Sequence, residues 1–126
     1  MRPIKFRAQD FTGTWQYGFI VKGNEQAIII PVHKDGTVAM GINIYVKPET
    51  IGEFTSLYDK NHREIYEGDI IKVGGEKQKI EVRFVRGVFA FLWGGNLDDE
   101  FPTCSPTHEW AEVVGNIHDN PKMLKR

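Results

Sequence analysis

The chain has 126 residues, with 16 Lys and Arg against 17 Asp and Glu, and a formal net charge of -1. This length fits one domain, or one domain with an extension, since domains commonly have about 100–150 residues. A composition of 40% hydrophobic and 26% charged residues excludes a wholly disordered chain. The near-zero net charge excludes the strong overall positive field that attracts proteins to nucleic-acid phosphates or anionic lipid.

The sequence predicts a cytoplasmic protein with no membrane partner. Cys104 is the single cysteine, so an internal disulfide is impossible and a reducing compartment is expected. The N-terminal residues lack the apolar run of a signal peptide, and no segment approaches the ~20 apolar residues that span a bilayer.

The first fifty residues alternate between apolar and polar side chains, which is typical of half-buried strands. Strands are expected over residues 4–8, 15–22, 27–32 and 38–46. Asp35 and Gly36 predict the hairpin turn between the last two strands, and Pro48 ends the region. We therefore expect residues 1–50 to form an N-terminal β region in which residues 22–47 are a hairpin excursion.

Residues 51–126 show the same alternation, interrupted by short turns. Strands are expected at residues 57–58, 64–66, 70–73, 80–85, 88–93 and 110–117, with a helical turn at 122–125. One face of the strand 80–85 is expected to point inward: Ile80, Val82 and Phe84. The other is expected to face water: Lys79, Glu81 and Arg83. Residues 94–108 hold two glycines, two prolines and three consecutive acidic residues, and are expected to form a long irregular loop.

Helical periodicity is nearly absent, so a fold with helices between the strands is disfavoured. The predicted fold is all-β, or mainly β: an SH3-like barrel or roll over residues 51–126, with an N-terminal β-hairpin extension and little helix. Aromatic side chains are expected to fill its core: Trp15, Tyr17, Phe89, Phe91, Trp93 and Trp110.

Two polar clusters are interpreted as structural turns. In Glu67-Gly68-Asp69, Gly68 permits a sharp bend and Asp69 accepts hydrogen bonds from backbone N–H groups. Glu67 and Asp69 also share one strand face, which is the arrangement that paired acid–base catalysis needs, but we favour the turn. Asn116 follows Gly115 and is expected to satisfy backbone groups in a bulge.

The turn over residues 59–63 is expected to contain positive φ angles at Asn61 and His62. Glycine adopts positive φ without a steric penalty, whereas histidine there costs about 1 kcal/mol of backbone strain.

The four histidines do not fall at the short spacings of zinc ligands. They are His33, His62, His108 and His118. Two alternatives stay open in the long loop: a metal site from His108, Cys104 and the acidic run 98–100, or a nucleophilic role for Cys104. A solvated loop is the favoured interpretation. We therefore predict no catalytic residue, no metal site and no cofactor.

The charges are uneven along the chain. The segment 72–86 has two acidic residues and five basic ones: Lys72, Lys77, Lys79, Arg83 and Arg86. The segment 87–112 has five acidic residues and no basic one. We favour the interpretation that the two segments form solvated faces that attract each other. The alternative is head-to-tail attraction between subunits. The five basic residues are also the candidate nucleic-acid-binding set.

Three blocks of the sequence resemble the YopX-like family of small phage and prophage proteins. The first is residues 4–8 with 15–18, the second is residues 54–70, and the third is residues 112–117 running into Asn120 and Pro121. The resemblance implies a mostly β protein with an SH3-like barrel element, encoded on phage or prophage DNA in a bacterium. It implies no catalytic residues.

This sequence departs from the family pattern at a few positions, all of which concern local turn geometry. Gln9 stands where an aromatic residue is common, and His118 replaces a tyrosine. Ser56 and His62 replace glycines.

The sequence therefore predicts a non-enzymatic interaction module that acts by protein–protein contact as a homo-oligomer in the bacterial cytoplasm. This prediction rests on two features. Several edge strands need pairing or protection, and the chain has no evident set of catalytic residues. A host or phage protein is a further expected partner. The alternative is a nucleic-acid-binding protein that uses the basic segment 72–86.

Overall fold

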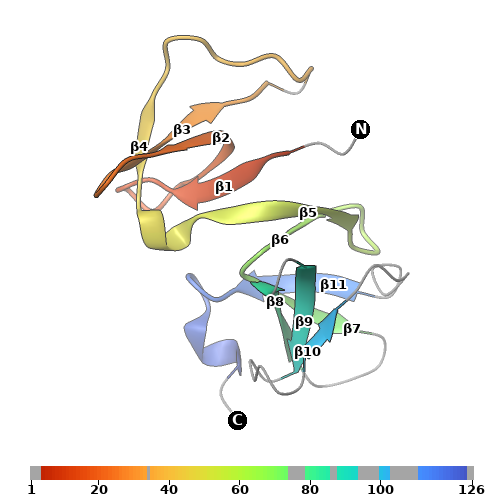
Figure 1. The fold of residues 1–126 in the computed structure, drawn as a ribbon. Helices are drawn as coiled ribbons and strands as arrows, with labels where there is room; N and C mark the ends of the chain where they lie inside the picture. Colours follow the sequence, from red (N-terminus) through yellow and green to blue (C-terminus); the bar gives the residue numbers. More distant parts are fainter. Residues whose placement is uncertain are drawn as a thin grey trace. The chain divides into compact units, whose positions relative to one another are not determined.

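The structure, a computed structural model, describes residues 4–33, 35–73, 79–85, 88–93, 100–102 and 111–124 (Figure 1). Its strands divide between two units, Met1–Phe54 and Thr55–Arg126. The prediction of an all-β fold is confirmed, because the strands form antiparallel sheets and the described helical segments are short 3-10 turns. The separation into domains at residues 50 and 51 stays a prediction.

The first unit contains four complete strands and the beginning of a fifth. They are β1 (Phe6–Gln9), β2 (Trp15–Lys22), β3 (Ala27–Pro31), β4 (Ile44–Val46) and β5 (Gly52–Tyr58), with the 3-10 turn η1 (Pro48–Thr50) before β5. They lie in the order β4-β3-β2-β1-β5, and each neighbouring pair is antiparallel. Short connections between consecutive strands make this the natural order.

Strands β1 to β4 roll up around a small core. A bridge joins Asp10 to Val46, and the N–H of Lys47 donates to the carbonyl of Gln9 at 2.8 Å, so the end of β4 meets the end of β1. The side chains enclosed by this roll are all aliphatic: Ala8, Ala27, Ile29 and Val46, with Ile20, Ile44 and Ile51 packed against them. Because successive strand residues point to opposite faces, the alternate residues of β2 are left on the outside, whereas on β1 Arg7 and Gln9 are buried as well as Ala8.

Gly18 is required by the close approach of β2 and β3. A Cβ atom at this position would lie 2.0 Å from the carbonyl oxygen of Ile30. No side chain fits in that space, so the strand register of the roll depends on a glycine here.

The predicted strand 38–46 is wrong over its first half. Val38 forms an isolated bridge with Val32, and the chain then turns twice before β4 begins at Ile44. The N–H of Ala39 donates to the carbonyl of Pro31, and Gly41 has φ 83°. Between the pairs Ile29–Ile44 and Val32–Val38 the chain advances three residues on β3 but six on the other segment, so the extra residues form turns instead of strand.

The second unit is a five-stranded antiparallel sheet together with a hairpin. Its elements are β6 (Glu64–Tyr66), β7 (Asp69–Val73), β8 (Lys79–Val85), β9 (Val88–Trp93), β10 (Glu100–Pro102), β11 (Ala111–Asn116) and the 3-10 turn η4 (Pro121–Leu124). The sheet order is β10-β9-β8-β7-β11. Its buried apolar cluster consists of Ile65, Ile71, Ile80, Val82 and Ala111. The SH3-like description of this unit is consistent with these strands and stays a prediction.

Two boundaries differ from the sequence prediction. The expected irregular loop 94–108 contains the strand β10, which pairs with β9 through Phe101 and Phe91. The expected helical turn at 122–125 is a 3-10 turn that begins at Pro121. None of the described helical segments is long or apolar enough to cross a membrane.

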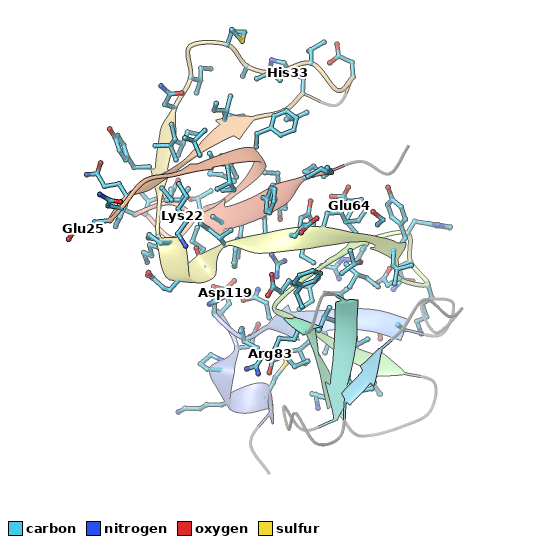
Figure 2. All side chains as sticks on the ribbon, in the orientation of Figure 1. Lys22, Glu25, His33, Glu64, Arg83 and Asp119 are labelled. Carbon is cyan, nitrogen blue, oxygen red and sulfur yellow. The ribbon has the colours of Figure 1, made fainter. Side chains whose placement is uncertain are left out.

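The predicted faces of β8 are wrong at two residues. Glu81 is 4% exposed instead of facing water, and Phe84 is 48% exposed instead of lying inside. The turn η4 lies close to β8, and Figure 2 shows Arg83 on the side toward the C-terminal segment. The Glu81 carboxylate accepts a hydrogen bond from Arg83 Nε at 3.1 Å, so the covered charge is paired.

The hairpin between β5 and β6 contains strained backbone. His62 has φ 65° and Ser56 has φ 70°, and these are the non-glycine residues with positive φ in the described part of the chain. The positive φ predicted for Asn61 is absent. The resemblance to the YopX-like family implies glycine at both of these positions.

We expect His62→Gly to leave the free energy of unfolding unchanged or to raise it by up to about 1 kcal/mol, because glycine adopts positive φ without a Cβ clash. Lys60→Gly, in the same turn but without positive φ, is the control and should destabilise the protein. Thermal and urea unfolding of both variants measure the difference. A clear loss of stability in His62→Gly would contradict the prediction.

Candidate functional site

The outside of the first unit carries large apolar side chains, which we call the outer apolar face. It consists of Tyr17, Phe19 and Val21 on β2 and Tyr45 on β4, which are 41% to 56% exposed. The register places Val21, Ile28 and Tyr45 in one line across β2, β3 and β4. The exposed side chains are therefore neighbours and not scattered single residues.

The expected core position of Tyr17 is wrong, since its side chain is 43% exposed. The face of β2 that the roll encloses carries Gly18 and Ile20. The larger residues of β2 are left outside, where folding does not require apolar groups. Contiguous apolar surface of this kind marks interaction sites in soluble proteins.

A rigid turn between β1 and β2 presents one more aromatic ring. The Asp10 carboxylate accepts hydrogen bonds from the hydroxyl of Thr12 at 2.6 Å and from the side-chain amide of Gln16 at 3.1 Å. These bonds, with those from the backbone of Thr14 and Thr12, lower the pKa of Asp10 to about 2. Phe11 lies in this fixed turn with its side chain 69% exposed.

One end of the first unit has a shallow hollow beside the outer apolar face. It is lined by the β1–β2 turn, the β2–β3 turn and the end of β4: Phe11, Glu25, Gln26, Ala27, Tyr45, Val46 and Pro48. The walls are mostly apolar, with two aromatic rings and a proline. Glu25 is the charged residue of its lining. Such a hollow accepts an apolar side chain of moderate size.

Basic residues near β1 lie against aromatic rings. The guanidinium of Arg7 is 4.6 Å from the centre of the Trp15 ring, and the ammonium of Lys5 is 5.3 Å from that of Phe54. These distances are those of cation–π contacts, which hold both cations in fixed positions.

In the second unit, the carboxylate of Asp59 connects the β5–β6 turn to β11. Its Oδ1 accepts from the N–H groups of Asn61 at 2.8 Å and Arg63 at 2.9 Å, and its Oδ2 accepts from the N–H of Val113 at 3.0 Å. The N–H of Lys60 adds a bond of 2.9 Å to the carbonyl of Ala111. Asp59 therefore links residues more than fifty positions apart in sequence.

The environment of Asp59 favours its ionised form. Burial of the side chain, which is 4% exposed, raises the pKa, but the hydrogen bonds from Val113, Arg63 and Asn61 and the charge of Arg63 outweigh it. The pKa of Asp59 therefore lies below its ordinary value. This carboxylate is an acceptor of backbone hydrogen bonds and is poorly suited to proton transfer near neutral pH.

The Glu67-Gly68-Asp69 corner is held by backbone contacts. Gly68 has φ 93°, its N–H donates to Val82, and its carbonyl accepts from Ile117. Asp69 is 1% exposed, and its Oδ2 accepts from the N–H of Tyr66 at 2.7 Å. The corner thus joins β8 and the end of β11, and the Asp69 carboxylate is directed at the turn.

Asn116 lies at the same, C-terminal end of β11, where it pairs with Asp69. Its side-chain oxygen accepts from the N–H groups of His118 and Asp119 at 3.0 and 2.8 Å. The register of β11 shifts between Val113 and Gly115, which is a bulge. A Cβ on Gly115 would lie 2.6 Å from the side-chain oxygen of Asn120, so a larger residue would require the side chains of the C-terminal turn to shift.

The candidate nucleic-acid-binding residues are only partly brought together. Lys72 on β7 pairs across the sheet with Lys79 on β8 and with Glu112 on β11. Arg83 is bonded to Glu81. Lys77 and Arg86 lie outside the described residues, as do His108, Cys104 and the acidic residues Asp98 and Asp99 of the proposed loop site.

We did not predict two of the functional features from the sequence. Asp59 belongs to a turn-rich segment, but nothing local indicates that its carboxylate reaches β11. The hollow joins three segments that are distant in sequence. The one signal in the sequence is Phe11, an aromatic residue directly after Asp10 between two predicted strands.

These features define an all-β protein with a rolled sheet, structural acidic turns and an exposed apolar surface. The family model described as YopX protein matches residues 5–125, so this chain belongs to the YopX family. A solved structure, protein EF1440 from Enterococcus faecalis, is similar with a TM-score of 0.60 and 23% identity, over 99% of this chain and 100% of that one. At this identity the similarity shows the fold alone. Comparison with curated proteins found no match.

We expect Asp59→Asn to lower the free energy of unfolding at pH 7 by at least about 2 kcal/mol, since hydrogen bonds to a charged group contribute about 1.5–3 kcal/mol. The folded-state pKa is depressed, so the contribution of Asp59 is present above the unfolded value of about 3.9 and lost as pH falls through the folded value. Urea unfolding from pH 7 down to pH 3 should therefore show the two proteins converging in acid.

Asp35→Asn is the matched control, because Asp35 also accepts bonds within its turn but joins no distant strand. Its effect at pH 7 should be clearly smaller. Equal effects of the two substitutions would show that the link to β11 contributes nothing.

Proposed function

We propose that this protein is a non-enzymatic interaction module of phage or prophage origin, which acts by protein–protein contact as a homo-oligomer in the bacterial cytoplasm. The observation that carries the proposal is the outer apolar face of the first unit. Tyr17, Phe19 and Val21 lie on one strand, and Tyr45 lies two strands away in the same line as Val21.

The outer apolar face has the chemistry of a protein-binding surface. It combines tyrosine and phenylalanine rings with aliphatic side chains, and aromatic residues are enriched at protein interfaces. Binding through this face costs little conformational entropy, because the strands that carry these side chains are already ordered.

The non-enzymatic part of the proposal is supported by what the buried acidic groups do. Asp59 and Asp69 accept backbone hydrogen bonds, and Glu81 is bonded to Arg83. Each of these carboxylates thus has a structural role within the second unit.

Replacing Phe19 and Val21 together by threonine tests the proposal. Threonine retains the β-branched preference for strands while removing most of the apolar surface. We expect the wild type to associate as its concentration rises and the variant to have a molar mass near that of one chain, about half or less of the wild-type value. Light scattering after size-exclusion chromatography measures this.

Tyr58→Thr is the matched control, since Tyr58 is 45% exposed on β5 and is not part of the outer apolar face. It should associate like the wild type. A wild-type protein that stays monomeric at all concentrations would remove the homo-oligomer, and an unchanged mass of the double variant would remove the role of this face.

A second candidate function is nucleic-acid binding through the segment 72–86. The observation in its favour is that Lys72 and Lys79 are cross-strand neighbours, which places two positive charges side by side. The adjacent Glu112 and the bond between Arg83 and Glu81 reduce the positive electrostatic field of this segment. Protein–protein contact is therefore the stronger of the two.

If the second candidate is correct, gel shifts with single- and double-stranded DNA should show binding at low salt that weakens steeply as salt rises. Replacing Lys72 and Lys79 by glutamine should then weaken binding and reduce the salt slope. Absence of any shift at low salt would eliminate this function.

A further inference from the structure

The hollow beside the outer apolar face is lined by residues on ordered backbone. Tyr45 and Val46 belong to β4 and pair with β3. Glu25 lies in the β2–β3 turn, which is closed by a bond of 2.7 Å from the N–H of Gly23 to the carbonyl of Gln26. The walls of the hollow therefore need little ordering when a ligand binds, which lowers the entropy cost of binding.

The size of the hollow limits what it can bind. Its volume is about 320 Å³, at the lower end of the ~300–1,000 Å³ of pockets that bind small molecules. This volume suits one long side chain rather than a large cofactor. Because the hollow is shallow, a side chain that remains attached to another protein can enter it.

The charge of the lining favours a cationic ligand. Glu25 is the charged residue of the lining, and in the part of the chain that the structure describes its carboxylate has no hydrogen bond or ion pair. Lys22 lies at the start of the same turn without an ion pair to Glu25 (Figure 2). The other charged residues on the three lining segments carry two positive and two negative charges: Lys22, Lys47, Asp10 and Glu49. Glu25 therefore decides the sign of the local charge, and a cation is attracted.

The aromatic rings of the lining favour a guanidinium over an ammonium group. Phe11 and Tyr45 are 69% and 56% exposed, so their rings are open to a ligand. A cation is attracted to the face of an aromatic ring, and the planar guanidinium also stacks on it. Arg7 makes such a contact in the same unit, with its guanidinium 4.6 Å from the centre of the Trp15 ring. A guanidinium also binds a carboxylate through two parallel N–H donors, whereas an ammonium is more strongly hydrated and has no flat surface.

We propose that the hollow binds an arginine side chain of a different protein, with the guanidinium against Phe11 and Tyr45 and paired with Glu25. Tyr45 belongs both to the hollow and to the outer apolar face, so a protein segment that packs on this face can place an arginine in the hollow. This inference rests on the proposed protein–protein contact but not on self-association, and it names the chemistry that the partner offers.

The arginines of this chain argue against a second copy as the source. Among those that the structure describes, each is held within its own chain. Arg7 is 6% exposed, and Nη1 of Arg63 donates to the carbonyl of Val113 at 3.3 Å. Arg83 is paired with Glu81. The proposal therefore commits to another protein with an exposed arginine.

The site is tested with N-acetyl-arginine amide, which carries the side chain and the peptide groups of an arginine within a protein. Titration into the ¹⁵N-labelled full chain should give saturable NMR shifts at Glu25, Gln26 and Tyr45. N-acetyl-citrulline amide has the same shape without the charge and should bind at least about tenfold more weakly. N-acetyl-lysine amide should also bind more weakly, by at least about threefold.

Two variants identify the groups that bind the probe. Glu25→Gln and Phe11→Leu should each weaken the binding of N-acetyl-arginine amide at least about fivefold. Glu49→Gln is the matched control, because it removes the same charge from an exposed residue beside Pro48 but outside the lining. It should bind the probe like the wild type. Since all three residues are exposed, none of the substitutions should change the melting temperature.

Several outcomes would overturn the site. They are the absence of saturable shifts, equal binding of the citrulline or lysine probe, and equal effects of Glu25→Gln and Glu49→Gln. Free arginine that binds more tightly than the amide would also overturn the proposal, because the ligand would then be a small molecule and not a protein.

The two proposals can fail separately. Failure of the arginine probe while self-association persists overturns this site alone. A monomeric wild type that binds the probe with the expected selectivity overturns the homo-oligomer alone.

Discussion

The roll of the first unit encloses one face of β2 and leaves the other face exposed, and this constraint accounts for the outer apolar face. The bridge between Asp10 and Val46 closes the roll around aliphatic residues, and the close approach at Gly18 permits it. The opposite face of β2 is left exposed, so its aromatic and aliphatic residues form an apolar surface, and one end of the roll has a hollow.

In the second unit, acidic side chains connect strands through irregular turns. Asp59 holds three backbone N–H groups from two separate segments, and Asp69 and Asn116 close the turns at the ends of β7 and β11. A buried N–H without an acceptor is costly, and an ionised or amide oxygen is a compact way to supply one. These side chains are of the types found in catalytic sites, but here they accept hydrogen bonds from the surrounding backbone.

This chain belongs to the YopX family, and its fold is similar to that of the Enterococcus faecalis protein EF1440. His62 and Ser56 adopt positive φ without being glycines. The backbone shape at Ser56, within β5, and at His62, in the β5–β6 turn, is therefore imposed by the surrounding strands, which tolerate a strained residue because the hairpin is tied to β11 through Asp59.

The amino-acid sequence by itself determined the fold class, most strand positions and the turns at Gly68 and His62, because alternation and turn chemistry are local properties. It did not determine which face of β2 is covered, since Tyr17 was expected inside and is exposed. On β8 the inward positions of Ile80 and Val82 were predicted correctly, but Phe84 is exposed and Glu81, on the opposite face, is buried as well. A two-residue period separates the faces of a strand without stating which one is enclosed. Closure of the roll and the approach of η4 to β8 decided that, since both depend on residues distant in the chain.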